Sequence, residues 1–373
     1  MADGTSTGAT STGNTSSMAG KARIAVIGTG WWATSIHLPV LVEHGDVELI
    51  AVCDTDPDKL AMVRDRFAIP RSYESHEQLL ASEDVDGVVV ATSHAHHYAV
   101  AKAALVRGAH VMIEKPMTIR AAEARELVDL ARRQSRQIIV GYTCSYLPNA
   151  RAARRIIRNG EIGRTQLIIS QYCSNVQHLL RGDDEPFSHR GLVAPSKAYS
   201  RPDLSGGGHG QTQLTHAIGL VFWLLDVHAV KVSGFMKSHG LAVDLVDALA
   251  VEFDGDVVGS FTGIGNARAH KTHDLQIYGD RGHVEMQVMG RQARVHRYEQ
   301  RHNSPEHHAE DCGWPLDGPV RNLVDVVLGR DENHSPGDMG WRAVEVLEAA
   351  YRSVEQGGAA VPVASLYSSQ EPA

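Results

Sequence analysis

The sequence is poor in cysteine and has no long apolar run. The four cysteines are far apart in a chain of 373 residues and form no Cys-x-x-Cys pair; they are Cys53, Cys144, Cys173 and Cys312. Such spacing argues against a disulfide framework and favours reduced thiols. No apolar segment approaches the roughly 20 residues of a membrane-spanning helix, and the N-terminus lacks the apolar core of a signal peptide. We therefore expect a cytoplasmic protein without a membrane partner.

The chain also lacks an excess of positive charge. It carries 36 Lys and Arg against 44 Asp and Glu, a net charge of −8, and no long block of like charge. This balance offers no general attraction for nucleic acid, and it makes local basic patches unexpected. With 43% hydrophobic residues the chain can bury a large core, and its length favours two domains.

Residues 1–20 lack the apolar side chains that a folded segment needs. They are almost entirely small or polar. Because such a segment cannot bury enough surface to offset the entropy of ordering, we predict a disordered tail. Met18 leaves open a later start of the native chain.

From Lys21 the sequence alternates between apolar β-branched runs and helical segments. The runs predict strands at 23–27, 47–53, 71–73, 85–91, 109–113 and 137–142. Helices are predicted between them, up to about residue 44 and then at 57–68, 76–82, 97–107 and 120–135. This order indicates a parallel sheet covered on both faces. We predict an α/β fold with a doubly wound Rossmann domain over residues 21–142.

After Tyr142 the rhythm changes. Strands follow one another without intervening helices, at about 229–238, 245–254, 256–264, 272–278, 282–288 and 292–297. The other predicted elements are a strand at 164–173, helices at 148–159, 211–225, 318–329 and 338–356, an irregular excursion at 175–205 and a polar loop at 299–316. We therefore predict a second α/β domain over 143–373 with a large, open, mainly antiparallel sheet, and leave open that the last helices pack back on the first domain.

A glycine-rich turn follows the first predicted strand. It reads G-x-G-x-x-A, with the residues Gly28, Thr29, Gly30, Trp31, Trp32 and Ala33. Gly28 permits a tight turn, Gly30 lets the backbone approach a pyrophosphate, and Ala33 allows close helix–strand packing. Asp54 ends the second predicted strand, 21 residues after Ala33. Its carboxylate can accept hydrogen bonds from a ribose and would repel a 2′-phosphate, so the pattern favours NAD over NADP; a plain turn with a solvated Asp54 is the alternative.

Three further segments carry a family resemblance. They are residues 91–97 (ATSHAHH), residues 109–117 (AHVMIEKPM, with Glu114-Lys115-Pro116) and residues 206–216 (GGGHGQTQLTH). These motifs resemble the glucose–fructose oxidoreductase / inositol dehydrogenase / rhizopine catabolism (Gfo/Idh/MocA) family. The resemblance implies a nicotinamide bound between the two domains, and an open sheet that mediates a homodimer or homotetramer.

The resemblance also implies roles for single residues. Lys115 matches the family's lysine and His216 its histidine, whereas the family's aspartate falls on Thr212 and a frequent arginine falls on Ser145. The expected cofactor-binding residues include the glycine turn with its two tryptophans, and Asp54. The motifs add Thr92, Ser93, His94, His97, Glu114 and Lys115.

The residues themselves point to alcohol oxidation. Lys115 follows the fifth strand, at the sheet edge where parallel sheets bind ligands, and burial would lower its pKa so that it can shuttle a proton. His216 is the candidate general acid or base. With helical spacing it shares a face with His209, Thr212 and Gln213, which we predict to bind substrate, as does Tyr142. A structural role stays open for each of these residues.

A metal site is not expected. His94, His96 and His97 stand close together, but no cysteine or carboxylate lies at a supporting spacing. The tract 302–308 (HNSPEHH) is read as a solvated loop.

The leading hypothesis is an NAD-dependent dehydrogenase of a secondary hydroxyl in a sugar, sugar derivative or cyclitol. The alternatives are transient oxidation with tightly held NAD, as in an epimerase, a lyase or a glycoside-cleaving enzyme, and a non-catalytic sugar or NAD sensor.

Overall fold

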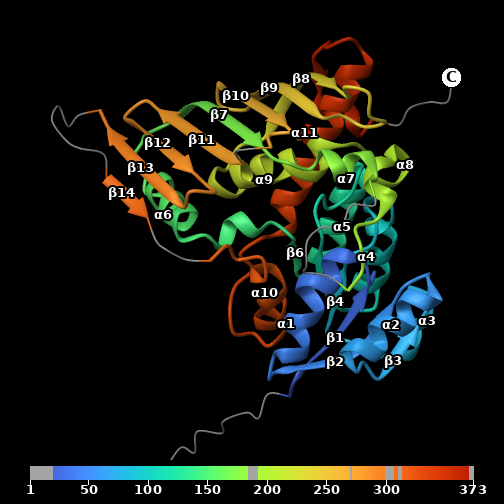
Figure 1. Ribbon diagram of the computed structural model, residues 1–373. Coiled ribbons are helices and arrows are strands. Elements are labelled where there is room, and N and C mark those ends of the chain that lie inside the picture. The colour runs from blue at the N-terminus through green and yellow to red at the C-terminus, as the bar shows by residue number, and fades with distance from the viewer. Residues whose placement is uncertain (1–19, 184–191, 269–270, 299–305, 310–312, 369–373) are drawn as a thin grey trace, which may run out of the picture.

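The computed structural model describes residues 20–183, 192–268, 271–298, 306–309 and 313–368. It contains two sheets with helices packed against both (Figure 1). One sheet is formed by residues up to 142, called here the first half of the chain, and the other by residues after 142, called the second half. The tail predicted over 1–20 falls, apart from Gly20, outside the described residues, as do Cys312 and most of the tract 302–308.

The first sheet has six parallel strands in the order β3-β2-β1-β4-β5-β6. Their bounds are β1 Ala22–Ile27, β2 Val47–Cys53, β3 Arg71–Tyr73, β4 Gly87–Val90, β5 His110–Ile113 and β6 Ile138–Val140. The order reverses between β1 and β4, which is the switch point where doubly wound sheets bind ligands. The predicted Rossmann topology is confirmed.

Helices cover both faces of this sheet. The helices within this part of the chain are α1 Leu38–Glu43, α2 Pro57–Phe67, α3 His76–Ser82, α4 His97–Val106 and α5 Ala121–Arg133. Another comes from far along the chain: α10, Gly318–Val327, packs beside α1, and its Leu323 joins the cluster around Ile24 and Met112 (Figure 1). The helix of the second half therefore completes the core of the first sheet.

The second sheet has nine strands in the order β14-β13-β12-β11-β7-β10-β9-β8-β15. Their bounds are β7 Thr165–Cys173, β8 Ala229–Lys237, β9 Val246–Phe253, β10 Val257–Ile264, β11 Thr272–Gly279, β12 Gly282–Gln287, β13 Gln292–Arg297, β14 Glu306–Ala309 and β15 Val361–Pro362. Among these pairs β7 and β10 run parallel and the others antiparallel. The predicted mainly antiparallel sheet is confirmed.

Two segments that were expected to be irregular contain regular structure. The polar stretch 299–316 includes β14, which pairs with β13 as an edge strand. The excursion 175–205 includes α7, Gln177–Arg181, a 3₁₀ turn at Lys197–Ser200, and α8, Pro202–Ser205. Both were missed because an edge strand and single helical turns need little apolar periodicity of their own; backbone pairing and caps suffice.

Three helices of the second half lie on one face of its sheet (Figure 1). They are α6 Pro148–Arg158, α9 Thr215–Leu224 and α11 Gly337–Glu355. Residues of α9 and α11 form one core cluster with the inward side chains of the sheet, such as Leu249, Phe261 and Val284. Among the described residues no helix lies on the opposite face of the sheet, and alternate strand residues are exposed there, among them Leu167, Ile169 and Val258.

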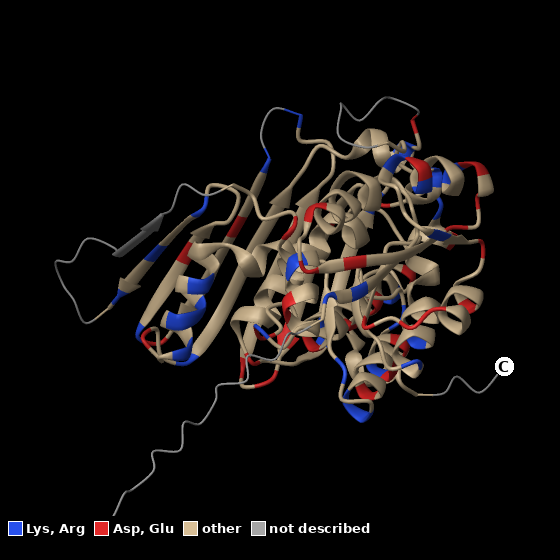
Figure 2. Ribbon diagram, turned by 90° about the horizontal axis from the view of Figure 1, so that it is seen from below, with Lys and Arg blue, Asp and Glu red and all other residues tan. Residues whose placement is uncertain are grey.

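Figure 2 shows acidic and basic residues interspersed along most of the chain and a local group of basic residues on α6. This helix carries Arg151, Arg154, Arg155 and Arg158, which makes a basic strip that the even overall balance concealed. Arg154 lies over the ring of Trp223, 4.2 Å from its centroid, so part of the strip packs on an aromatic side chain.

Two expectations from composition can be compared with the described residues. Cys53, Cys144 and Cys173 are free thiols. No helix within the described ranges is long and apolar enough to span a bilayer.

Candidate active site

The glycine turn after β1 has two glycines with different tasks. Gly28 has φ of 94°, and a Cβ there would lie 2.5 Å from the carbonyl carbon of Ala91. A Cβ on Gly30 would meet no atom within 4 Å. Gly28 is therefore required by the close approach of β1 and β4, whereas Gly30 keeps the space in front of the turn free for a ligand.

Asp54 at the end of β2 is held by four donors, one of which is the backbone N–H of Asp56, 3.2 Å from its Oδ1. The backbone N–H and the hydroxyl of Thr29 donate to its Oδ2, at 2.8 and 2.9 Å. The ammonium of Lys59 lies 2.7 Å from its Oδ1. These contacts fix the carboxylate beside the glycine turn, which is the place from which an acidic side chain reaches an adenosine ribose.

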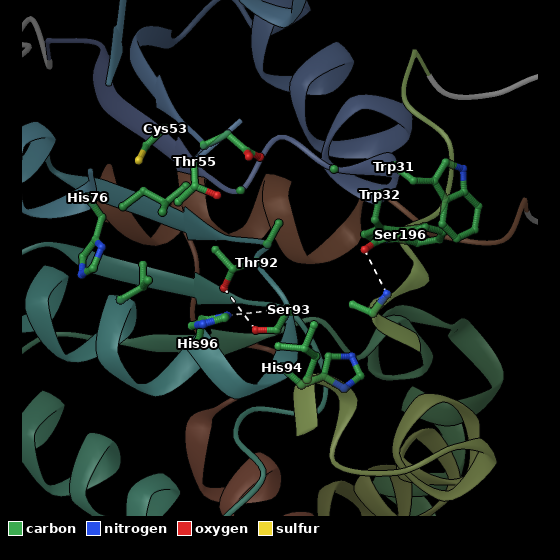
Figure 3. A pocket seen from close by; sticks show the side chains of 18 of the residues that line it. Trp31, Trp32, Cys53, Thr55, His76, Thr92, Ser93, His94, His96 and Ser196 are labelled. Atoms are coloured by element: carbon green, nitrogen blue, oxygen red, sulfur yellow. Dashed lines mark hydrogen bonds between the residues drawn. The ribbon is translucent and has the colours of Figure 1, made fainter. Parts of the chain in front are cut away.

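A cavity of about 490 Å³ opens in front of this turn (Figure 3). Trp31, Trp32 and Ser196 lie at one end of it, and Cys53, Thr55 and His76 at the other. Of the residues predicted to bind cofactor, eight line the cavity: Gly28, Gly30, Trp31, Trp32, Asp54, Thr92, Ser93 and His94. Its size and mixed lining suit a dinucleotide better than a small substrate alone.

Sequence reasoning missed several lining residues. The segment 196–205 folds over the cavity and contributes Ser196, Ala198, Tyr199, Leu204 and Ser205. The region near the adenosine end adds Thr55, Lys59, Glu74 and His76. The first group comes from a loop that is distant in sequence. The second group lies in or next to the β2–α2 and β3–α3 turns, and these residues could have been predicted from the topology alone.

Four predicted cofactor residues lie behind the lining. Thr29 is fully buried and serves Asp54. His97 is fully buried between the carbonyls of Pro116 and Thr92, at 2.9 and 3.1 Å from its ring nitrogens. Glu114 is buried against His37, with 2.9 Å between Oε1 and Nε2. The fourth, Lys115, is described next.

Lys115 projects from the end of β5 toward the second half of the chain. Its ammonium donates to the main-chain carbonyl of Thr212 at 2.8 Å. Burial lowers the pKa of Lys115, while the carboxylate of Glu114 acts in the opposite direction. The charge of Lys115 also helps to lower the pKa values of His94, in the cavity wall, and of His216. Lys115 is therefore close enough to His94 and to His216 for its charge to act on both.

His216 lies near the start of α9 between two tyrosine rings. Its ring centroid is 5.8 Å from that of Tyr142 and 6.2 Å from that of Tyr172, which stacks on it. Its Nδ1 is buried and has no hydrogen-bond partner within the described ranges. Burial holds the pKa of His216 well below its usual range, and the charge of Lys115 and the nearby His273 act in the same direction. The ring is thus neutral at neutral pH and can accept a proton.

The helix that bears His216 does not begin as the regular α-helix expected at 211–225. A π-helical turn, Gly210–Leu214, precedes α9. The wider turn breaks the 3.6-residue periodicity, so the four polar residues do not share one open face. Gln213 and His216 are half-buried, whereas His209 and Thr212 are buried.

Three predicted substrate residues make internal hydrogen bonds. The hydroxyl of Thr212 donates to the carbonyl of Gly208 at 2.8 Å. His209 bonds to Asp247, with 2.7 Å between Nδ1 and Oδ2. The hydroxyls of Tyr142 and Thr215 are 2.7 Å apart. A substrate role for His209, Thr212 and Tyr142 stays a prediction.

An anchor for the glycine-rich segment was not foreseen. Asp244 accepts hydrogen bonds from the N–H groups of Gly208 and Gly210, both at 2.7 Å, and from the hydroxyl of Tyr351 at 2.8 Å. A Cβ on Gly207 would lie 2.0 Å from the Tyr351 oxygen, and one on Gly208 would lie 2.0 Å from the Asp244 carbonyl oxygen. The run of glycines lets this segment pass close to both residues, and only the run itself was visible in the sequence.

The three clustered histidines do not converge on one point. The ring of His94 bonds to the carbonyl of Ser205, that of His96 to the hydroxyl of Ser93, and that of His97 to backbone carbonyls. Each ring has its own partner, so this group is arranged for hydrogen bonding and packing.

Family models match both halves of the chain. Residues 22–142 match the oxidoreductase family with an NAD-binding Rossmann fold, and residues 150–285 match the GFO/IDH/MocA C-terminal domain. The chain belongs to the Gfo/Idh/MocA oxidoreductases. The resemblance inferred from the Glu-Lys-Pro and glycine-rich motifs is confirmed, and NAD is the cofactor of its Rossmann domain, whose turn, carboxylate and cavity fit it.

Two relatives illustrate the similarity in sequence. An uncharacterized oxidoreductase of Synechocystis sp. is 35% identical over 145 residues, which cover 39% of each chain. D-glucoside 3-dehydrogenase of Escherichia coli is 28% identical over 209 residues, covering 56% of this chain and 55% of the enzyme. The matching regions thus span less than two thirds of these relatives.

Solved Gfo/Idh/MocA-like structures extend the similarity of fold to nearly the whole chain. A levoglucosan dehydrogenase in complex with NADH and levoglucosan superposes with a TM-score of 0.74 at 17% identity, over 92% of this chain and 99% of that one. At this identity the likeness concerns the fold.

Proposed function

We propose that this protein is an NAD-dependent oxidoreductase that acts on a secondary hydroxyl of a sugar, sugar derivative or cyclitol. The observation that carries the proposal is the hydrogen bond from the buried Lys115 to the Thr212 carbonyl, which holds its charge near His94 in the cavity wall and near a neutral His216. Two similar proteins are named as dehydrogenases of a glucoside and of levoglucosan, and they support a cyclic polyol as the class of substrate.

The cofactor supplies one part of the chemistry: when bound, NAD is the hydride acceptor. Gly30 leaves room for the dinucleotide, and Asp54, fixed by Thr29 and Lys59, accepts hydrogen bonds from the ribose. Trp31 and the segment 196–205 line the cavity, where they can limit the access of water.

Lys115 and His216 supply proton transfer. The Lys115 ammonium, oriented by the Thr212 carbonyl, donates a hydrogen bond to the substrate oxygen, and the unprotonated His216 ring takes the hydroxyl proton. The stack on Tyr172 orients the imidazole. Gln213 is half-buried beside them and can hydrogen-bond a neighbouring hydroxyl. The alcohol thereby loses one hydride and one proton.

The direct test is turnover of NAD with a set of cyclic polyols, including a glucoside, levoglucosan and an inositol, followed by the absorbance of reduced nicotinamide. Lys115→Met and His216→Asn should each lower kcat by about 10²–10⁴-fold and leave NAD affinity in place. Lys102→Met is the matched control, since its ammonium pairs with Glu126 at the surface. Wild-type kcat in either site variant, or no turnover of any polyol, would contradict the proposal.

A transient redox cycle is the second candidate. This candidate is supported by the partner of Lys115. Here that partner is a main-chain carbonyl, whereas members of the family are expected to carry a carboxylate at this position. A temporary ketone acidifies the neighbouring C–H bond and permits epimerisation, elimination or glycoside cleavage. Product that forms from the polyol with no accumulation of reduced nicotinamide, and with cofactor that copurifies, would favour this candidate over net dehydrogenation.

We also propose that the helix-free face of the nine-stranded sheet forms a homodimer or homotetramer. Leu167, Ile169 and Val258 are 37%, 38% and 53% exposed on this face, and apolar strand residues without a cover favour association. A monomeric mass in light scattering at micromolar concentration would contradict this assembly. The expected compartment is the cytoplasm.

A further inference from the structure

Three potential metal ligands meet on the helix-free face of the nine-stranded sheet, on its outer strands β12 and β13. His283 and His296 are direct cross-strand partners, and Glu285 follows His283 by two residues, so all three side chains point to the same face. The intervening residues Val284 and Val295 point into the core. The hairpin register brings the three together, although the sequence separates the histidines widely.

The distances among these side chains match a ligand set better than a hydrogen-bonded one. Nε2 of His283 lies 3.6 Å from Oε1 of Glu285, and Nε2 of His296 lies 3.7 Å from its Oε2. Both exceed ordinary hydrogen-bond lengths. Each distance, to a different oxygen of the same carboxylate, is slightly longer than the roughly 3.4 Å that separates two ligand atoms of a tetrahedral site with bonds of about 2.0–2.1 Å. One ligand atom from each of the three residues falls within 4.8 Å of the others.

The histidine nitrogens are also available. Nε2 of His296, one of the two nitrogens that face Glu285, is enclosed and has no hydrogen-bond partner within the described ranges. The two rings stack at 4.2 Å and 5°, and Tyr278 stacks on the other side of His283 at 4.8 Å.

We propose that His283, Glu285 and His296 form a binding site for a divalent transition-metal ion of the zinc type. Two imidazoles and one carboxylate are a known zinc ligand set that leaves a fourth position for water or another ligand. The parallel rings must rotate slightly apart so that both Nε2 lone pairs face one ion. Bound there, the ion ties β12 to β13 near the open edge of the sheet, on the face away from the buried Tyr172 and His273.

The test is calorimetric titration of the full chain with Zn²⁺. We expect one tight site in the wild type. His296→Ala and Glu285→Gln should each lower the affinity for Zn²⁺ at least 10-fold, since even mutation of residues that only support the ligands of a zinc site costs roughly 10-fold. Zn²⁺ should also raise the melting temperature of the wild type and leave that of the two variants unchanged. Co²⁺ should give the visible spectrum of a four-coordinate site in the wild type alone.

Controls separate this site from other histidines. His228→Ala removes an exposed histidine that pairs with Asp254, and it should bind Zn²⁺ as the wild type does. A triple variant, His302→Ala, His307→Ala and His308→Ala, tests the histidine-rich tract 302–308 and should also keep the tight site. Equal Zn²⁺ affinity in the wild type, His296→Ala and Glu285→Gln, or loss of the tight site in the triple variant, would overturn the proposal. So would a wild type that binds no Zn²⁺.

Discussion

The ammonium of Lys115 donates a 2.8 Å hydrogen bond to the main-chain carbonyl of Thr212, within the π-helical turn that precedes α9. The hydroxyl of Thr212 turns the other way, to the carbonyl of Gly208. Thr212, which the sequence motif leads us to expect at the place of the family's aspartate, thus holds the lysine with its backbone. A carbonyl dipole compensates the burial of Lys115 less than a carboxylate does, which agrees with its lowered pKa.

This arrangement predicts a mild phenotype for Thr212→Val. The variant keeps the main-chain carbonyl and loses one hydroxyl hydrogen bond, so we expect a loss of about 1 kcal/mol in the free energy of unfolding with kcat and KM little changed. Urea unfolding and steady-state kinetics measure both. A large rise in KM with unchanged stability would show instead that the hydroxyl contacts the substrate.

Asp54 should determine the choice of cofactor. Asp54→Asn removes the charge that repels a 2′-phosphate and weakens the hydrogen bonds to the ribose. We expect NAD affinity to fall and the preference for NAD over NADP to narrow, as measured by fluorescence titration with both cofactors. Lys102→Met is the control, because it removes a surface ammonium that pairs with Glu126 away from the cavity. Equal loss of affinity for both cofactors in Asp54→Asn would argue against the ribose contact.

Asp244 should position α9, the helix that bears His216, without touching the substrate. Asp244→Ala leaves the buried N–H groups of Gly208 and Gly210 without their acceptor, at a cost of about 1–3 kcal/mol for each unpaired group. Because these glycines precede Thr212 and His216, kcat should fall together with stability. Tyr351→Phe removes one donor to the same carboxylate and should cost only about 1 kcal/mol. Similar losses in the two variants would contradict the anchoring role.

The sequence predicted the local and periodic features of this molecule well. Strand and helix order, the glycine turn and Asp54 all follow from short-range patterns, and these fix the Rossmann topology and one side of the cavity. The family motifs led to Lys115 and His216. The proposed boundary between the domains at 142/143 stays a prediction, since α10 packs on the first sheet.

What the sequence did not predict depends on contacts between distant residues. The π-helical turn arises where Gly208 and Gly210 bind Asp244, which lies over thirty residues away. Segment 196–205 reaches the cofactor cavity only through the fold of a long excursion. The cluster of His283, Glu285 and His296 exists because of hairpin register, which sequence spacing does not reveal without the pairing.

His273 on β11 predicts how stability changes with pH. It is 1% exposed, neither ring nitrogen has a partner within the described ranges, and burial lowers its pKa to about 3. An unfolded histidine titrates near 6.5, so the unfolded state binds more protons between these values. The stability that His273 contributes is therefore complete above about pH 6.5 and is lost as the pH falls toward 3, by about 1.4 kcal/mol per pH unit.

His273→Phe tests this linkage because it keeps an aromatic ring against Tyr172, 4.9 Å away, and removes the titrating group. Urea unfolding at several pH values should show a slope between pH 6 and pH 4 that is shallower than that of the wild type by about 1.4 kcal/mol per unit. Stability at pH 7.5 should not fall, since no hydrogen bond is lost. His228→Ala, which removes an exposed histidine, should keep the wild-type slope. If His273→Phe keeps it too, the ring of His273 is hydrated or paired in the folded protein and its pKa is not lowered by burial.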